Sequence, residues 1–208
     1  MDQLILNLIM IAVLLGVAFP LHEFSHAWVA YLRGDATAKL FGRMTLNPVV
    51  HFDMFGGLMT IISIFLGGFL IGWAKPTPVN TANLKNRSND EVLVALAGPA
   101  SNLVMAVLGA FVFRLIVLMN LSLPNLVAQG LYLFVTFNVM LAVFNMIPVP
   151  PLDGGTLLFR FLSPKQVWQV RPFLAQYGMF IVIAVVLLGG RYISGLINGV
   201  TLTLLGVG

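Results

Sequence analysis

The stretch AFPLHEFSHAWVAYL (Ala18–Leu32) places two histidines and a glutamate inside an apolar run that begins near Leu4. A run of about 20 apolar residues is long enough to cross the hydrocarbon core of a bilayer, which is roughly 30 Å thick. Counted back from Arg33 at about 1.5 Å per residue, Glu23 lies roughly 15 Å inside the end of the predicted helix. A carboxylate at such depth costs at least a few kcal/mol unless it faces a partner or a water-filled cavity.

The composition of the whole chain is typical of an integral membrane protein. Hydrophobic residues make up 59% of its 208 residues and charged residues 9%, whereas a soluble domain carries about 25% charged residues. The net charge of +4 suits a membrane surface, and no basic block with interleaved aromatics supports nucleic-acid binding. The absence of cysteine excludes disulfides, a thiolate nucleophile and cysteine-ligated metal.

Apolar runs separated by short polar segments predict an all-α polytopic membrane protein with about five to six hydrophobic segments. The runs lie at about 4–32, 55–73, 92–119, 126–147, 173–188 and 192–207. No internal repeat or low-complexity tract interrupts them. The tryptophans lie mostly near the ends of runs, as interface anchors do.

Basic residues are concentrated in three of the polar segments. These residues are Arg33, Lys39 and Arg43, then Lys75, Lys85 and Arg87, and finally Arg160, Lys165 and Arg171. The turn at 120–125 carries none, so the positive-inside rule places that turn outside and the three basic segments in the cytoplasm.

The run at about 55–73 must then begin and end on the cytoplasmic side. It is short and glycine-rich, with Gly56, Gly57, Gly67, Gly68 and Gly72. We interpret it as a re-entrant or interfacial hairpin. The alternative is an ordinary membrane span, which hydropathy alone would predict.

His22, Glu23 and His26 form the pattern H-E-x-x-H. Residues four apart share one helix face, about 5–6 Å apart between Cβ atoms, so both imidazoles can bind one metal ion. Glu23 is placed to act as general base toward water, and zinc is the expected ion because it accepts imidazole and carboxylate ligands. Ordinary helices also carry this pattern by chance, but the membrane depth favours the metal. Pro20, just before the motif, predicts a kink.

A catalytic zinc site usually has three protein ligands, and Asp153 is the best candidate for the third. It lies in NMIPVPPLDGGTLLF (Asn145–Phe159), where three prolines end an apolar helix. Gly154 and Gly155 predict a tight turn or a positive φ that aims the carboxylate inward. A plain helix-terminating turn is the alternative. The first and fourth runs both lead to the cytoplasm, so the histidines and Asp153 can meet at one depth.

The other candidate ligands are less suited to the role. Asp2, Asp35, Asp90 and Glu91 are loop carboxylates, most of them beside basic residues. His51 and Asp53, in NPVVHFD, are expected to satisfy their own turn instead.

These motifs together resemble the site-2 protease family of intramembrane zinc metalloproteases, in its compact branch without PDZ or CBS domains. The residues concerned are HEFSH (22–26), PLDGG (151–155), GRMTLNPVVHFD (42–53), GWAKPTPVN (72–80) and AGPASN (97–102). The match covers roughly residues 15–160. The family's usual Asn-Pro-Asp-Gly appears here as Pro-Leu-Asp-Gly, a departure that leaves Asp153 in place.

The resemblance implies one Zn²⁺ per chain, held by His22, His26 and Asp153, with Glu23 activating water. It implies membrane-protein substrates cut within their transmembrane segments. We therefore expect one integral membrane domain over residues 1–208, with a catalytic core at about 4–160 and C-terminal hydrophobic segments at about 173–207. A multi-pass location in the cell membrane is expected, with the active site toward the cytoplasmic side.

Three further expectations concern residues around this site. Asn102 is a candidate to bind substrate or the developing oxyanion, with helix packing as the alternative. Asn145 is a candidate to orient the Asp153 turn, whereas packing is the better interpretation of Asn138. Residues 39–53 are expected to form a β-hairpin-like, membrane-associated loop whose edge strand pairs with substrate.

Two other functions remain open at this point. A metal-binding transporter or channel would also carry polar residues inside the membrane. Such proteins usually scatter those residues along a path or show inverted repeats, neither of which this chain does. A catalytically silent relative is the third possibility, against which the intact Glu23 argues.

Overall fold

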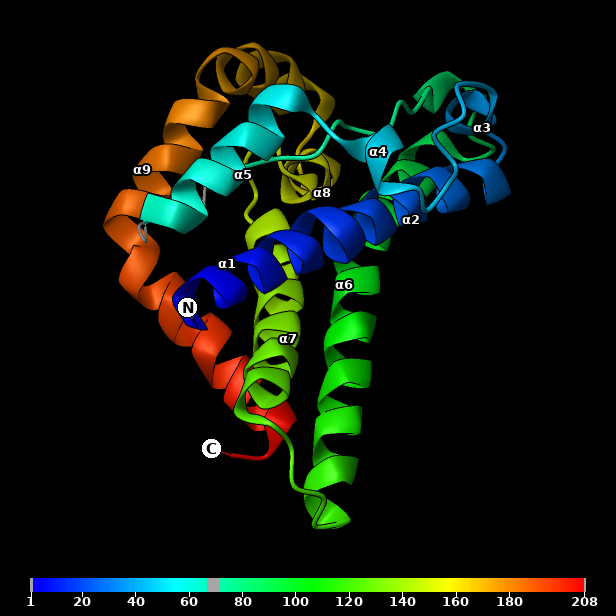
Figure 1. The fold of residues 1–208 in the computed structure, drawn as a ribbon. Coiled ribbons are helices and arrows are strands. Elements are labelled where there is room, and N and C mark those ends of the chain that lie inside the picture. The colour runs from blue at the N-terminus through cyan, green and yellow to red at the C-terminus, as the bar shows by residue number, and fades with distance from the viewer. Residues whose placement is uncertain (1, 67–71, 208) are drawn as a thin grey trace.

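A computed structural model describes residues 2–66 and 72–207, and its regular structure in these ranges is helical (Figure 1). The elements in chain order are α1 (Asp2–Val13), the π-helix η1 (Leu14–Ala18), α2 (Phe19–Leu32), α3 (Thr37–Leu40), α4 (Pro48–His51), α5 (Met54–Leu66), the 3-10 helix η2 (Thr81–Asn83), α6 (Arg87–Leu118), α7 (Asn125–Asn145), α8 (Asp153–Phe161) and α9 (Pro164–Leu205).

Four of the described helices are long and apolar enough to cross a membrane, which agrees with the predicted helical membrane class. They are Gln3–Leu32, α6, α7 and α9. The run predicted at 173–188 and most of the run predicted at 192–207 lie within α9, which ends at Leu205, so no chain reversal separates them. Residues 189–191 are Gly-Gly-Arg, and glycine costs a helix only about 1 kcal/mol where proline would cost about 3.

The long helices form the frame that holds the rest of the chain. Figure 1 shows α6 and α7 running alongside each other, with the α1–η1–α2 helix crossing them obliquely and α9 passing along one flank. Buried apolar side chains fill the crossings in three clusters. One contains Leu14, Ala18, Ile64, Phe137 and Leu141, a second contains Ala106, Ala110, Val135, Val139 and Leu205, and a third contains Ala30, Leu84 and Val94.

The first long helix is irregular just before its histidines. Residues Leu14–Ala18 form a π-helix, and Pro20 follows two residues later. Proline has no N–H to donate, and its ring crowds the carbonyl four residues back, so a widened turn relieves the clash. The irregularity expected at Pro20 is therefore present as a π-turn.

The ends of α2 and α6 lie beside each other. The Lys85 N–H donates to the Arg33 carbonyl at 3.0 Å, and Arg33 Nε lies 3.7 Å from Asp90 Oδ1. The two ends of segment 33–86 therefore lie next to each other. Within it α5 has 13 residues, fewer than the roughly 20 needed for a span. The rest of the predicted 55–73 hairpin includes Gly67 and Gly68, which lie outside the described residues.

The β-hairpin-like loop expected at residues 39–53 is not confirmed, because the described residues contain no strand there. The segment carries α4 and the end of α3, each a single helical turn. Local bonds explain the difference. The Asn47 side chain accepts the Val49 N–H at 3.0 Å with Pro48 at the first helical position, and the Arg43 N–H donates to the Ala38 carbonyl at 2.8 Å.

Candidate metal centre

Three side chains converge where α2, α6 and α8 meet. His22 and His26 come from α2, and Asp153 is the first residue of α8. The two imidazole Nε2 atoms are 3.1 Å apart. Asp153 Oδ2 lies 3.2 Å from His22 Nε2, and Asp153 Oδ1 lies 3.4 Å from His26 Nε2. Both histidines are buried, and the Asp153 side chain is half-buried.

The approach of Asp153 depends on the turn between α7 and α8. This turn contains the Pro148, Pro150 and Pro151 residues that end α7, with a cis Pro150–Pro151 peptide. A tight turn or a positive φ was predicted for Gly154 and Gly155, and neither residue has a positive φ, because both lie in the first turn of α8. They provide room instead. A Cβ at Gly154 would lie 2.4 Å from the Ile147 carbonyl oxygen, and one at Gly155 would lie 2.5 Å from Pro150 N.

A third glycine allows α6 to pass directly behind the histidines. A Cβ at Gly98 would lie 2.4 Å from His26 Nε2 and 2.6 Å from His22 Nε2. Real Cβ atoms do not approach side-chain atoms so closely, so position 98 can hold only glycine while the pair keeps its place. AGPASN (97–102) thus contributes space as well as polar groups.

The outer nitrogens of both histidines are hydrogen-bonded. His22 Nδ1 donates to Asn102 Oδ1 and His26 Nδ1 donates to the Val94 carbonyl, each at 2.7 Å. The Val94 carbonyl can only accept, so the hydrogen must be on His26 Nδ1. The Asn102 amide group donates to the Ala18 carbonyl at 3.2 Å, which leaves its oxygen for His22. Both Nε2 atoms therefore present lone pairs to the centre of the cluster.

The amide of Asn102 is fully engaged. Its nitrogen donates to the Ala18 carbonyl and, at 3.0 Å, to Asn138 Oδ1. Asn138 in turn donates to the Phe134 carbonyl at 2.8 Å, and both asparagines are completely buried. In this arrangement no amide hydrogen of Asn102 remains for an oxyanion, and Asn138, which we expected to serve packing, continues the network.

The remaining predicted residues lie outside this network. Asn145 Nδ2 donates to the Leu141 carbonyl of its own helix at 3.0 Å. His51 is buried and bonds the Thr45 carbonyl through Nε2 at 2.7 Å, while Asp53 accepts the Gly56 N–H at 2.8 Å. His51 and Asp53 thus satisfy local backbone groups, as expected for a turn.

Glu23 has a partner that sequence reasoning missed. The Thr77 N–H donates to Glu23 Oε2 at 2.7 Å, and the Thr77 hydroxyl donates to the Glu23 backbone carbonyl at 2.9 Å. Thr77 lies between Pro76 and Pro78 in the extended segment after residue 71. The signal in the sequence was a single threonine bracketed by prolines, which forces extended backbone and leaves one N–H donor.

The chemistry of the donor set fits a zinc ion. Two imidazole lone pairs and a carboxylate face one another, and Asp153 Oδ2 is buried without a hydrogen-bond donor. Ligand atoms around tetrahedral zinc, each about 2.0–2.1 Å from the ion, lie about 3.3 Å from one another. The separations of 3.1, 3.2 and 3.4 Å match this value. A cation is what three converging acceptors require.

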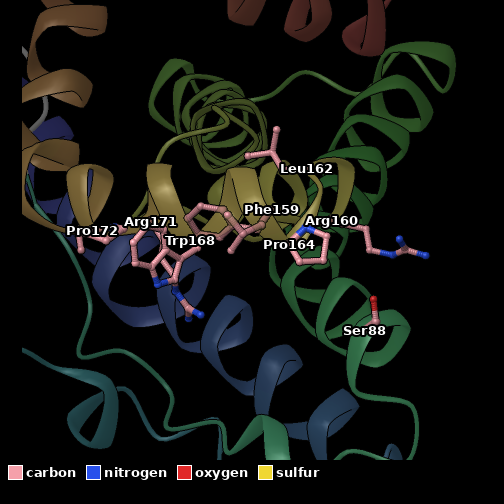
Figure 2. A pocket seen from close by; sticks show the side chains of 10 residues that line it. Ser88, Phe159, Arg160, Leu162, Pro164, Trp168, Arg171 and Pro172 are labelled. Carbon is pink, nitrogen blue, oxygen red and sulfur yellow. The ribbon is translucent and has the colours of Figure 1, made fainter.

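A separate pocket of 730 Å³ lies beside the far end of α8. Figure 2 shows its side chains coming from the second half of α8 and the first turns of α9, with Ser88 of α6 at one side. Arg160, Trp168 and Arg171 are exposed in it. Tryptophan and arginine side chains are typical of the boundary between membrane and water.

Comparisons with known proteins give the chain its family. A helical membrane protein with this His-His-Asp cluster and an adjoining glutamate has the make-up of a metallopeptidase. The model of "Peptidase family M50" matches residues 10–123 and 116–188. "Putative zinc metalloprotease YwhC" of Bacillus subtilis is 36% identical over 197 residues, which are 90% of this chain and 85% of YwhC. The chain belongs to peptidase family M50, which confirms the resemblance to site-2 proteases.

Two mycobacterial relatives are more distant. "Putative zinc metalloprotease Rip2" of Mycolicibacterium smegmatis is 31% identical over 175 residues, or 80% of this chain and 62% of Rip2. "Putative zinc metalloprotease Rip3" of Mycobacterium tuberculosis is 32% identical over 200 residues, or 94% of this chain and 42% of Rip3. No solved structure matches the chain.

Proposed function

We propose that this protein is an intramembrane zinc metalloendopeptidase that cleaves transmembrane segments of other membrane proteins. The observation that carries the proposal is the convergence of His22, His26 and Asp153 with Glu23 one residue from the first histidine. In this proposal the first three residues bind one zinc ion. The family membership and the printed names of the relatives point to the same chemistry.

The chain's own residues have distinct roles in the reaction. Zinc, when bound, supplies a Lewis acid that polarises the scissile carbonyl and makes water more acidic. Glu23 accepts the proton of the attacking water and passes a proton to the leaving amine. Asn102 and the Val94 carbonyl hold the imidazole rings in the tautomer that leaves Nε2 free. Thr77 holds the Glu23 carboxylate.

The proposed location is the cell membrane, with several spans and the active centre toward the cytoplasmic side. The basic segments around residues 33–43, 75–87 and 160–171 favour cytoplasmic placement. The contact between Arg33 and both Lys85 and Asp90 supports one side for the end of α2 and the start of α6. With those ends on one side, α5 makes no net crossing and is re-entrant in this proposal. We place the whole chain, 1–208, in one membrane domain with its catalytic core at about 4–160.

The decisive experiment compares wild type with Glu23→Gln in liposomes containing a panel of tagged single-span membrane proteins. We expect wild type to cut at least one of them, and Glu23→Gln to bind one zinc ion per chain without cutting. His22→Ala and Asp153→Ala should lose both zinc and activity. Cleavage by Glu23→Gln would reject Glu23 as the base. Zinc binding without cleavage of any substrate by wild type would favour a transporter or a silent relative.

A further inference from the structure

Arg43 is a buried cation between α3 and α4, only 6% exposed. Its Nη1 donates to the Val50 carbonyl, and its Nη2 donates to the Lys75 carbonyl and, at 3.3 Å, to the Pro76 carbonyl. A buried arginine requires partners that repay the loss of hydration. Here the partners are backbone oxygens of two segments about 25 positions apart, so one side chain joins residues 43–50 to residues 75–76.

The segment that Arg43 holds is the segment that contacts Glu23. Pro76 and Pro78 have no N–H, so Thr77 carries the one backbone donor between residues 76 and 78. That donor bonds the Glu23 carboxylate, and the Thr77 hydroxyl bonds the Glu23 carbonyl. The Lys75 N–H also donates to the His51 carbonyl at 2.8 Å. A backbone hydrogen bond therefore joins the same two segments that the Arg43 side chain joins.

We propose that Arg43 is a positioning residue for Glu23. It fixes the backbone at Lys75 and Pro76, and this placement directs the Thr77 N–H at the carboxylate. The inference rests on the proposed role of Glu23 as the general base. The planar fork of arginine suits it for this task because it can donate to several carbonyls at fixed angles, which the single ammonium of lysine cannot do.

The charge of Arg43 also favours the proposed position of the Glu23 carboxylate. Burial lowers the pKa of Arg43, whereas attraction to the Glu23 carboxylate raises it. The net result is a lowered pKa for Arg43, but an arginine side chain stays protonated at any physiological pH. The positive charge and the Thr77 N–H therefore both favour one position of the carboxylate.

The kinetic test uses the full chain in liposomes with a tagged single-span protein that wild type cleaves. We expect Arg43→Met to lower kcat about 10- to 100-fold, the usual cost of a misplaced catalytic group, with KM and zinc content unchanged. Arg43→Lys should restore only part of kcat. Arg87→Met, which removes an exposed arginine at the start of α6, is the matched control and should keep full kcat.

A second pair of variants isolates the Thr77 N–H. Thr77→Ala removes the hydroxyl and keeps the N–H, whereas Thr77→Pro removes both in backbone already flanked by prolines. We expect Thr77→Pro to lower kcat as far as Arg43→Met does, and Thr77→Ala to lower it less. Because both act through one contact, the double variant should be no slower than either single variant. Additive losses would overturn the proposal.

A readout independent of activity follows from the absence of cysteine. A nitroxide on Lys75→Cys reports the mobility of the held segment, and one on Lys165→Cys, also exposed, is the control. Replacing Arg43 by Met should increase mobility at position 75 and not at 165. Unchanged mobility at 75, unchanged kcat or loss of zinc in Arg43→Met would reject the positioning role. If Glu23→Gln is inactive in the same assay, such a result leaves the proposed function intact.

Discussion

His22 and His26 differ in the groups that orient them. The ring of His26 is held by a backbone carbonyl, which no substitution removes, whereas the ring of His22 is held by the Asn102 side chain. Asn102 is itself fixed by Ala18 and Asn138. The proposed metal centre is therefore sensitive to mutation of Asn102, which contacts the ring of His22 but is not itself among the proposed ligands.

Replacing Asn102 by Leu should weaken zinc binding about 10- to 100-fold, the usual effect of losing the group that orients a ligand histidine. Asn102→Asp keeps an oxygen for His22 Nδ1 and should retain more zinc than the leucine variant. Asn145→Leu is the control, because Asn145 bonds its own helix. Competition with a chelator measures the affinities. Equal affinity in wild type and Asn102→Leu would contradict this role.

At the scale of single residues, the sequence predicted best those site residues that lie close to one another along the chain. His22, Glu23 and His26 lie within one helical turn, so their spacing alone places both imidazoles on one face. Asp153 followed from the prolines and the direction of the helices. The partners of Asn138 and Thr77 could not be predicted, because they lie 36 and 54 positions away. The prolines around Thr77 mark an extended segment with one N–H donor, but they do not identify Glu23 as its acceptor.

Among the elements, the pairing of α2 with α6 determines whether the site can form. Gly98 provides the space in which the two imidazoles lie against α6. Gly98→Ala should therefore displace the histidines and lower both zinc content and proteolysis at least 10-fold, as misplaced ligands do. Gly199→Ala in α9 is the matched control, since a Cβ there would meet nothing within 4 Å. Retention of full zinc content by Gly98→Ala would show that α6 can move aside at no cost.

The joint between the end of α2 and η2 depends on a buried carboxylate. Asp35 accepts the Thr37 N–H at 3.1 Å, the Asn80 N–H at 2.7 Å and the Asn83 amide at 2.9 Å. Burial raises the pKa of Asp35, but these bonds and the Thr37 hydroxyl outweigh burial and hold the pKa below its ordinary value. A lowered pKa means that the folded protein binds this proton less tightly than the unfolded chain does.

The stabilisation from Asp35 is thus complete above the ordinary carboxyl pKa of about 3.9 and is lost as the pH falls through the lower, folded pKa. Asp35→Ala should lower the free energy of unfolding at neutral pH by about 1–3 kcal/mol, because buried donors lose their acceptor. The difference between variant and wild type should shrink as the pH falls below the ordinary carboxyl pKa of about 4. Thermal unfolding in detergent from pH 3 to 7 measures this. A difference that is constant with pH would contradict the assignment.

Element boundaries were predicted less well where short-range hydrogen bonds could favour a different backbone conformation from the one that the hydrophobic pattern indicates. Residues 39–53 were expected as strand, but Asn47-Pro48 caps a helical turn and Arg43 bonds backward to Ala38. The apolar pattern broke near residue 190, yet α9 continues, since a helix tolerates glycine and no proline stops it. In both places short-range hydrogen bonding decided the structure, and hydrophobic pattern alone does not report it.

For the whole molecule, the proposed orientation makes the 120–125 turn external and residues near 85 and 165 cytoplasmic. Single cysteines can be introduced without a background, because the chain has none. A membrane-impermeant maleimide on intact cells should label Leu121→Cys and leave Lys85→Cys and Lys165→Cys unlabelled until the cells are permeabilised. Leu66→Cys, at the end of α5, should also stay unlabelled from outside. Labelling of Leu66→Cys on intact cells would indicate an ordinary span instead.

The proline-bracketed segment beside Glu23 has a consequence for how two chains meet. Extended backbone with free N–H and carbonyl groups pairs readily with a second strand and promotes aggregation. Between residues 75 and 78 the only N–H groups are bonded to His51 and Glu23, and the Lys75 and Pro76 carbonyls are bonded to Arg43. Proline is one of the residues that protect exposed sheet edges in this way. The segment beside Glu23 thus offers few free backbone groups for another chain to pair with, which limits aggregation between crowded copies in the membrane.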